Sequence, residues 1–165
     1  MSGKVIQTLR LSPLTATLSE AELRSLANCG RLNTYSQGET ILEANDLDER
    51  LFLLREGRLV VQVSIWTESG QCGGETKLEL ASPGSPFGWA AWMREDFITM
   101  SAYAAEPVSL VAFDLQRLGD SQTFMKVSQR MLQILYGILQ EHGLCPPNIQ
   151  AWLRIKRLLQ AGEVP

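Results

Sequence analysis

Residues that could carry out chemistry are few in this sequence and lie far apart. The three cysteines, Cys29, Cys72 and Cys145, form no CxxC pair, and His142 is the only histidine. A structural zinc site or an iron–sulfur cluster needs three or four ligands at close spacing. Catalysis needs paired carboxylates, or a nucleophile beside a base. We therefore expect free thiols, no metal site and no enzymatic activity.

Composition places the chain among globular proteins of ordinary size. It has 165 residues, 45% hydrophobic and 20% charged, which suits one domain. The net charge of −3 disfavours general nucleic-acid binding, which needs clustered lysines and arginines. The apolar run near residues 97–105 is too short to span a bilayer, and the N-terminus leads into no apolar signal region. We expect a cytoplasmic protein that binds neither nucleic acid nor membrane.

The first predicted element is a short helix with a recognisable start. Ser19 and Glu22 form a capping-box pattern, in which each side chain accepts a hydrogen bond from the other residue's backbone. Leu23 and Leu26 then fall on one helical face. Gly30 is well placed to end the helix.

Residues 31–114 have the period of two that is typical of strands. In segment 58–66 every second residue is apolar and shares one face: Leu59, Val61, Val63 and Ile65. Turn signals separate the short strands, and the one at Glu56–Gly57 predicts a tight hairpin. Many short strands at regular spacing predict a mainly β domain, a jelly-roll β-barrel flanked by helices.

After Asp114 the pattern changes back to that of a helix. Apolar residues recur every three or four positions, which predicts one long helix over about residues 115–142. Gly143 and the Pro146–Pro147 pair end it. We expect residues 1–145 to form one domain that includes this helix, followed by a short helical tail at residues 146–165.

Short motifs follow one another in a specific order: Leu26-Ala27, Gly38-Glu39, Leu51-Phe52-Leu53-Leu54, Glu56-Gly57, Pro83-Gly84, Phe87-Gly88 and Ala102 to Ala105. Over about residues 14–142 this order resembles the cyclic nucleotide-binding domains of the catabolite activator family. The resemblance implies a helix, a jelly roll with a phosphate-binding cassette, and a long C-terminal helix. In that family a DNA-reading domain, a kinase or a channel follows the roll. Because few residues follow His142, we expect no winged helix-turn-helix here.

Within this resemblance, the cassette has lost its two charged side chains. In the family an arginine pairs with the cyclic phosphate, a carboxylate accepts from the ribose hydroxyl, and helix amides add donors. Trp89 stands at the carboxylate position and Ile98 at the arginine position. We therefore expect cyclic AMP and cyclic GMP to bind weakly or not at all.

The resemblance also implies which residues face a ligand: Phe87, Gly88, Trp89, Ala90, Ala91, Ile98 and Thr99. Of these, Thr99 carries a hydroxyl that is expected to serve as a donor. Arg94 and Glu95 lie nearby, either as substitutes for the lost charges or as solvated turn residues.

Two interpretations of the cassette stay open because its surroundings are strongly apolar: Trp89, Trp92, Phe97, Ile98 and Met100. These residues either line a pocket for an apolar or aromatic ligand or fill the former ligand site. Haem would need axial ligands, and the candidates have no recognised spacing: Cys29, Cys72, Met100 and His142. Haem is therefore not expected, and the cofactor stays unassigned.

The long helix carries a wide apolar stripe that we expect to form a homodimer: Val127, Met131, Ile134, Leu135 and Ile138, with Leu132 and Leu139 beside them. The resemblance implies the same pairing of helices. Alternatively, the tail at residues 152–159 folds back and covers the stripe of a monomer.

Two functions remain in competition at this stage. The first is a non-enzymatic regulatory module in which a small ligand enters the roll and reorients the long helix. The alternative is a ligand-free module for protein interaction or dimerisation.

Overall fold

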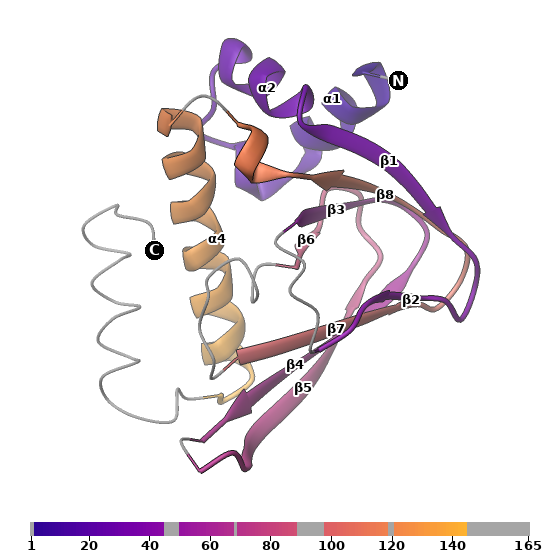
Figure 1. Cartoon of the computed structure of the whole chain (residues 1–165), viewed down its shortest axis with the longest axis vertical. Coiled ribbons are helices and arrows are strands. Elements are labelled where there is room, and N and C mark those ends of the chain that lie inside the picture. The colour runs from indigo at the N-terminus through magenta and orange to yellow at the C-terminus, as the bar shows by residue number, and fades with distance from the viewer. Residues whose placement is uncertain (1, 45–49, 68, 89–97, 119–120, 145–165) are drawn as a thin grey trace.

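A computed structural model of the chain describes residues 2–44, 50–67, 69–88, 98–118 and 121–144. Helices precede and follow the strands (Figure 1). The helical elements are α1 (Ser2–Leu11), η1 (Pro13–Thr15), α2 (Glu20–Ala27), η2 (Leu115–Arg117) and α4 (Ser121–Glu141). The strands are β1 (Gly30–Tyr35), β2 (Thr40–Leu42), β3 (Leu51–Glu56), β4 (Leu59–Trp66), β5 (Cys72–Leu80), β6 (Pro86–Phe87), β7 (Ile98–Ala104) and β8 (Val108–Phe113). None of the described helices is long and apolar enough to cross a membrane.

The strands form two antiparallel sheets that face each other. Their orders are β1-β8-β3-β6 and β2-β7-β4-β5, and the chain passes repeatedly from one sheet to the other. This arrangement confirms the predicted jelly roll. In the part of the chain that the structure describes, no ladder joins the two sheets, so the roll is a pair of sheets and not a closed barrel.

The second sheet follows the predicted alternation. The four apolar residues of β4 that share a face are at most 1% exposed: Leu59, Val61, Val63 and Ile65. Val60 and Gln62, which point the other way, are partly exposed. The period of two therefore identified the inward face of this sheet correctly.

In the first sheet, strands β3 and β8 are covered on both faces, and their alternation is lost for that reason. All four residues 51–54 of β3 are at most 2% exposed. In β8, residues 110–113 are all at most 4% exposed, so both faces of this strand are buried as well. Helix α1 packs on the outer side of β1 and β3, where its Val5 approaches Gly30. A sheet between a helix and a second sheet needs apolar residues throughout.

Gly57 does not form the hairpin that the sequence predicted. Strand β3 belongs to the first sheet and β4 to the second, so this turn carries the chain between sheets. Gly57 has a φ of +95°, and a Cβ there would lie 2.4 Å from the carbonyl oxygen of Pro107. Tight packing against a neighbouring loop explains the glycine.

Two predicted helix boundaries were also wrong. Helix α2 ends at Ala27, and Gly30 begins β1, where a Cβ would lie 2.8 Å from the Phe113 ring. The long helix begins at Ser121 rather than near residue 115. Residues 115–117 form the separate turn η2, in which the Asp114 carboxylate accepts from the amide of Gln116 at 3.1 Å. Helix α1 was not predicted at all.

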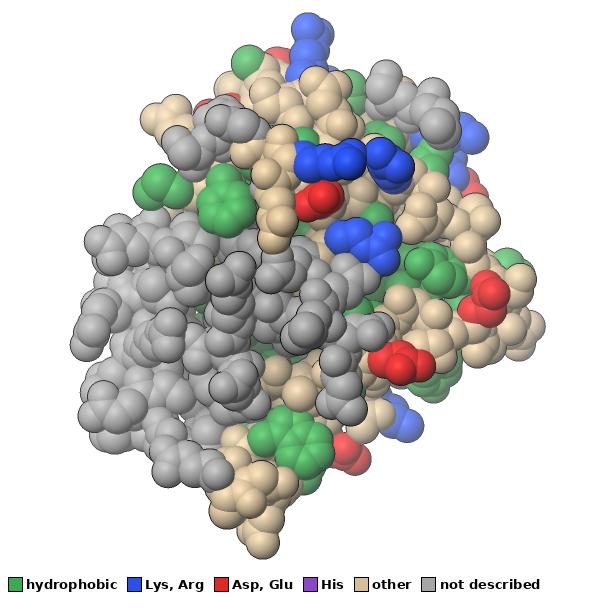
Figure 2. All heavy atoms as spheres, in the orientation of Figure 1, with side chains coloured by type: hydrophobic (Ala, Val, Ile, Leu, Met, Phe, Trp, Pro, Cys, Tyr) green, Lys and Arg blue, Asp and Glu red, His purple; other side chains and the backbone are tan. Residues whose placement is uncertain are grey.

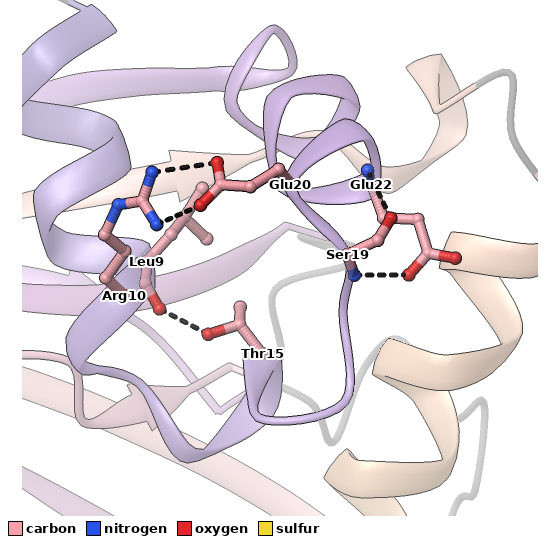
Figure 3. Close-up of polar contacts among 6 residues, drawn as sticks. All are labelled: Leu9, Arg10, Thr15, Ser19, Glu20 and Glu22. Atoms are coloured by element: carbon pink, nitrogen blue, oxygen red, sulfur yellow. Dashed lines mark hydrogen bonds and ion pairs between the residues drawn. The ribbon is translucent and has the colours of Figure 1, made fainter.

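The capping box is confirmed (Figure 3). The Ser19 hydroxyl accepts from the Glu22 amide at 3.2 Å, and the Glu22 carboxylate accepts from the Ser19 amide at 3.1 Å. Nearby, Arg10 of α1 forms a two-pronged ion pair with Glu20 of α2. The hydrogen bond from Arg10 is the main cause that lowers the pKa of the Glu20 carboxyl. These contacts join the first two helices.

Helix α4 is tied to the N-terminal helices by polar contacts. The Lys126 ammonium lies 2.9 Å from a carboxylate oxygen of Glu22, whose side chain is only 12% exposed. Further along α4, Arg130 donates to the carbonyl oxygen of Pro13 at 3.1 Å. In Figure 1, α4 runs from the helical end of the molecule along the roll toward β5, and Leu144, which follows it, packs at Gly74.

We predict that Gly57→Ala destabilises the protein more than Gly38→Ala. Both glycines have positive φ, +95° and +86°, so alanine costs roughly 1–2 kcal/mol of backbone strain at either site. Only at Gly57 would the new Cβ also meet backbone; at Gly38 nothing lies within 4 Å. Urea unfolding should show an additional loss of at least about 1 kcal/mol for Gly57→Ala. Equal losses would contradict the close packing of the crossover.

Candidate ligand site in the jelly roll

The cassette begins with a buried aromatic pair. The register of β3 and β6 places Phe52 opposite Phe87. Their rings stack with centroids 5.1 Å apart and planes at 14°, and both side chains are at most 1% exposed. Sequence reasoning recognised Phe87 through the motif but gave Phe52 no role, because it lies in a continuous apolar run without a period.

Gly88 follows the pair at a point where only glycine fits. Its φ is +93°, and a Cβ would lie 2.7 Å from the Phe52 ring and 3.0 Å from the Arg50 carbonyl oxygen. The Arg50 guanidinium in turn lies over the Phe52 ring, 5.1 Å from its centroid. Arg50 was not a sequence candidate. The start of β3 therefore determines where the chain turns into the cassette.

The amide of Gly88 is already hydrogen-bonded. It donates to the Met100 sulfur at 3.2 Å, in a buried contact. Met100 lies on β7 opposite Val63 of β4 and is 3% exposed. A thioether accepts only weakly, but here it engages the backbone amide at the start of the cassette. The sequence named Met100 as an apolar neighbour of the cassette and a haem candidate, and neither idea predicted this contact.

Ile98 lies inside the apolar wall of the roll. It is the first residue of β7, is 4% exposed and pairs with Ile65 of β4. Its face continues through Met100, Ala102 and Ala104, which are also at most 3% exposed. A charged group at this inward position would need a partner, because an unpaired buried charge is expensive. Isoleucine removes both the charge and that need.

Thr99 does not share a face with Ile98. Neighbouring residues of a strand point to opposite sides, and Thr99 is partly exposed. Its hydroxyl oxygen accepts from the indole N–H of Trp66 at 2.7 Å. This contact belongs to the outer side of the β4–β7 ladder.

The other cassette candidates, Trp89, Ala90, Ala91, Arg94 and Glu95, lie outside the described residues, as do Trp92 and Phe97.

The haem candidates lie on separate elements. Cys29 follows α2 and donates to the Ser25 carbonyl at 3.7 Å, whereas Cys72 is exposed at the start of β5. The His142 ring lies 3.0 Å from the Ile138 carbonyl at the end of α4. Among the described residues, no group of three or more His, Cys, Asp and Glu side chains could hold a metal.

A family model of the cyclic nucleotide-binding domain matches residues 32–120, more than half of the chain. The chain belongs to this family. A search among curated proteins gives no match. The matched segment contains both sheets apart from the first residues of β1, and it includes the whole cassette.

Solved structures of regulatory proteins are similar to this cyclic nucleotide-binding domain. The catabolite activator protein of Thermus thermophilus has a TM-score of 0.60 and 27% identity, covering 79% of this chain and 59% of that one. The sensor domain of the transcriptional regulator DNR from Pseudomonas aeruginosa has a TM-score of 0.57 and 21% identity, with coverages of 86% and 91%.

A third similar structure is a mutant regulatory subunit of a cAMP-independent protein kinase A from Trypanosoma brucei, bound to cAMP in its A site. It has a TM-score of 0.61 and 19% identity, covering 84% of this chain and 47% of that one. This chain thus spans about half of the Trypanosoma protein chain and 59% of the Thermus one. Of these structures, one is described as the sensor domain of a transcriptional regulator and another as a kinase regulatory subunit.

We predict that Met100→Leu destabilises the protein more than Met131→Leu. Both methionines are at most 3% exposed, and the exchange nearly conserves volume. Only Met100→Leu leaves the buried Gly88 amide without its acceptor, which should add about 1 kcal/mol. Chemical denaturation of both variants measures the difference. Equal losses would show that the sulfur contact contributes nothing.

Proposed function

We propose that this chain is a non-enzymatic regulatory module that works without cyclic AMP or cyclic GMP. The observation that carries the proposal is Ile98, which stands at the family's arginine position, 4% exposed and paired with Ile65. Among the described residues of this wall, a buried cyclic phosphate would face the apolar side chains of β7 and β4. Breaking a buried charge pair by removing one partner costs about 3–5 kcal/mol. That corresponds to roughly two to three decades of affinity.

Two further observations support the proposal. The Gly88 amide, a donor at the start of the cassette, is engaged by Met100. In addition, the Trypanosoma protein described as cAMP-independent is bound to cAMP as a mutant whose three substitutions include threonine to arginine. This comparison supports a link between an added arginine and cAMP binding in a protein of the same fold.

The function that fits best is sensing of a ligand that needs no buried cation, with the signal passed to α4. The wall of β4 and β7 suits an uncharged, apolar molecule. In the alternative form of the proposal the roll holds no ligand and serves as a scaffold for protein interaction. Native mass spectrometry of the purified protein separates the two, because a carried ligand adds mass and a scaffold does not.

We predict that calorimetry with millimolar cyclic AMP or cyclic GMP gives no saturable heat. The double substitution Trp89→Glu and Ile98→Arg should introduce measurable binding, because it restores the carboxylate and the guanidinium. Ile98→Met is the control, since it changes the side chain without adding a charge. Thermal unfolding confirms that each variant is folded. Micromolar binding of either nucleotide to the unchanged protein would refute the proposal.

A homodimer through α4 remains part of the proposal, with a smaller contact than the sequence suggested. Val127, Met131 and Leu135 are at most 1% exposed within the single chain, so they belong to its core. Ile134 and Ile138 are only partly buried and are the members of the stripe that reach the surface of α4. These two residues are the proposed centre of a short helix crossing.

We predict that Ile134→Glu combined with Ile138→Glu converts a dimer into a monomer, because like charges would then meet across the contact. Gln133→Glu, at an exposed position of the same helix, should leave the dimer intact. Light scattering behind a sizing column measures the mass at tens of micromolar. A monomer mass for the unchanged chain would refute the homodimer.

A further inference from the structure

A hollow of about 260 Å³ lies at the edge of the second sheet, where β2 meets β7. Its lining comes from the end of β2, the two residues after it and the middle of β7: Thr40, Leu42, Glu43, Ala44, Ser101, Ala102 and Tyr103. None of them was among the candidate site residues.

The hollow belongs to the outer side of the roll. Tyr103 pairs with Thr40 of β2, so their side chains share one face of the sheet. That face is the outer one, because Tyr103 is 42% exposed while Ala102 and Ala104, which alternate with it, are at most 2% exposed. Ser101 lies on the same outer side of β7. The site is therefore distinct from the roll interior.

A β-bulge determines which side chains of β2 reach the hollow. Thr40 pairs with Tyr103 and Leu42 with Ala102, so Ile41 is an extra residue in this strand. Ile41 and Leu42 are both buried, which leaves Thr40 as the outward residue of β2. The ladder between β2 and β7 ends at Leu42 in the described part of the chain.

Three hydroxyl groups line the hollow, those of Thr40, Ser101 and Tyr103. Within the described part of the chain, none of the three forms a hydrogen bond with another protein group. By contrast, the Thr99 hydroxyl further along β7 accepts from the Trp66 indole at 2.7 Å. Each free hydroxyl can donate one hydrogen bond and accept others, so the hollow offers several polar contacts to a ligand.

The charges around the hollow favour a neutral ligand. Among its described lining residues, Glu43 is the one charged side chain, and it already takes part in another interaction. No lysine or arginine belongs to that lining, so an anion would find no cation to pair with. On the face shown in Figure 2, most Lys and Arg side chains gather toward the helical end of the molecule, away from the second sheet.

Tyr103 adds an exposed ring to these polar groups. A tyrosine ring has an apolar face and a polar hydroxyl, so it can pack against C–H groups and form a hydrogen bond at the same time. A sugar ring is the complement of such a surface, because it carries C–H groups on its faces and hydroxyls around its rim.

We propose that this hollow binds a free monosaccharide, a single neutral sugar ring. The hollow is smaller than the roughly 300–1,000 Å³ of pockets for drug-sized molecules, so it suits one ring better than an extended ligand. With a few hydrogen bonds and one aromatic contact, the dissociation constant should be on the order of millimolar. The site goes beyond the proposed function, because it uses no residue of the roll interior.

An NMR titration of the isotope-labelled chain with glucose and with galactose tests the proposal. Amide shifts should saturate at millimolar sugar and be largest in residues 40–44 and 99–103. Glycerol at equal concentration is the control for the solvent, since it has hydroxyls but no ring, and it should give no saturable shift.

Ser101→Leu should weaken sugar binding tenfold or more, because leucine fills the hollow and removes a hydroxyl. Thr34→Leu is the matched control: it exchanges a hydroxyl side chain for leucine at an exposed position of β1, in the other sheet. It should leave the affinity unchanged. Thermal unfolding shows whether both variants are folded.

Two substitutions of Tyr103 separate its ring from its hydroxyl. Tyr103→Phe removes one hydrogen bond and should weaken binding about fivefold. Tyr103→Ala also removes the ring, so its loss should be clearly larger. A merely structural role of Tyr103 would lower the thermal stability without this graded loss of affinity.

The proposal is overturned if neither sugar gives saturable shifts, if glycerol gives the same ones, or if the shifts lie outside residues 40–44 and 99–103. It is also overturned if Ser101→Leu binds as Thr34→Leu does, or if both Tyr103 variants bind alike. Ile98→Arg alters the roll interior alone and should not change sugar binding, so the two proposals fail separately.

Discussion

The ligand region depends on the packing of Phe52 against Phe87. An aromatic pair of this kind contributes about 0.5–1.5 kcal/mol beyond its buried area, but its larger effect is geometric. The Phe52 ring occupies the space that a side chain at residue 88 would need, so the chain must turn there with glycine at positive φ. That turn directs the Gly88 amide to Met100. One contact thus determines the start of the cassette and the partner of its first amide.

Ligand chemistry and fold are separable at residue 98, because the fold requires only that the side chain there faces inward. The roll requires that residues 98, 100, 102 and 104 of β7 face inward, and isoleucine meets this requirement at residue 98. An arginine there meets it only with an anion to pair with. Isoleucine therefore retains the sheet pairing with β4, and under the proposed function it supplies no charge for a phosphate.

At the helical end, one carboxylate joins two elements, α2 and α4. Glu22 caps α2 through the Ser19 amide and also receives the Lys126 ammonium from α4. Because its side chain is only 12% exposed, the pair is less screened by water than a surface ion pair. Under the proposed function, the C-terminal helix α4 is the element that responds to the roll. Here its position is coupled to the start of α2, far from the cassette in the sequence.

The jelly roll, the inward face of β4, the capping box and the family could all be predicted from the sequence. Periods and motifs depend on residues that are close together in the chain, so they can be read without a structure. The replacement of the two charged cassette side chains by Trp89 and Ile98 stays a prediction from the motif. Three features depend on tertiary packing and could not be predicted. The chain crosses between the sheets at Gly57, α1 covers the outer face of β3, and the Met100 sulfur accepts a hydrogen bond from the Gly88 amide. Contacts between residues far apart in the chain depend on packing, which no local pattern records.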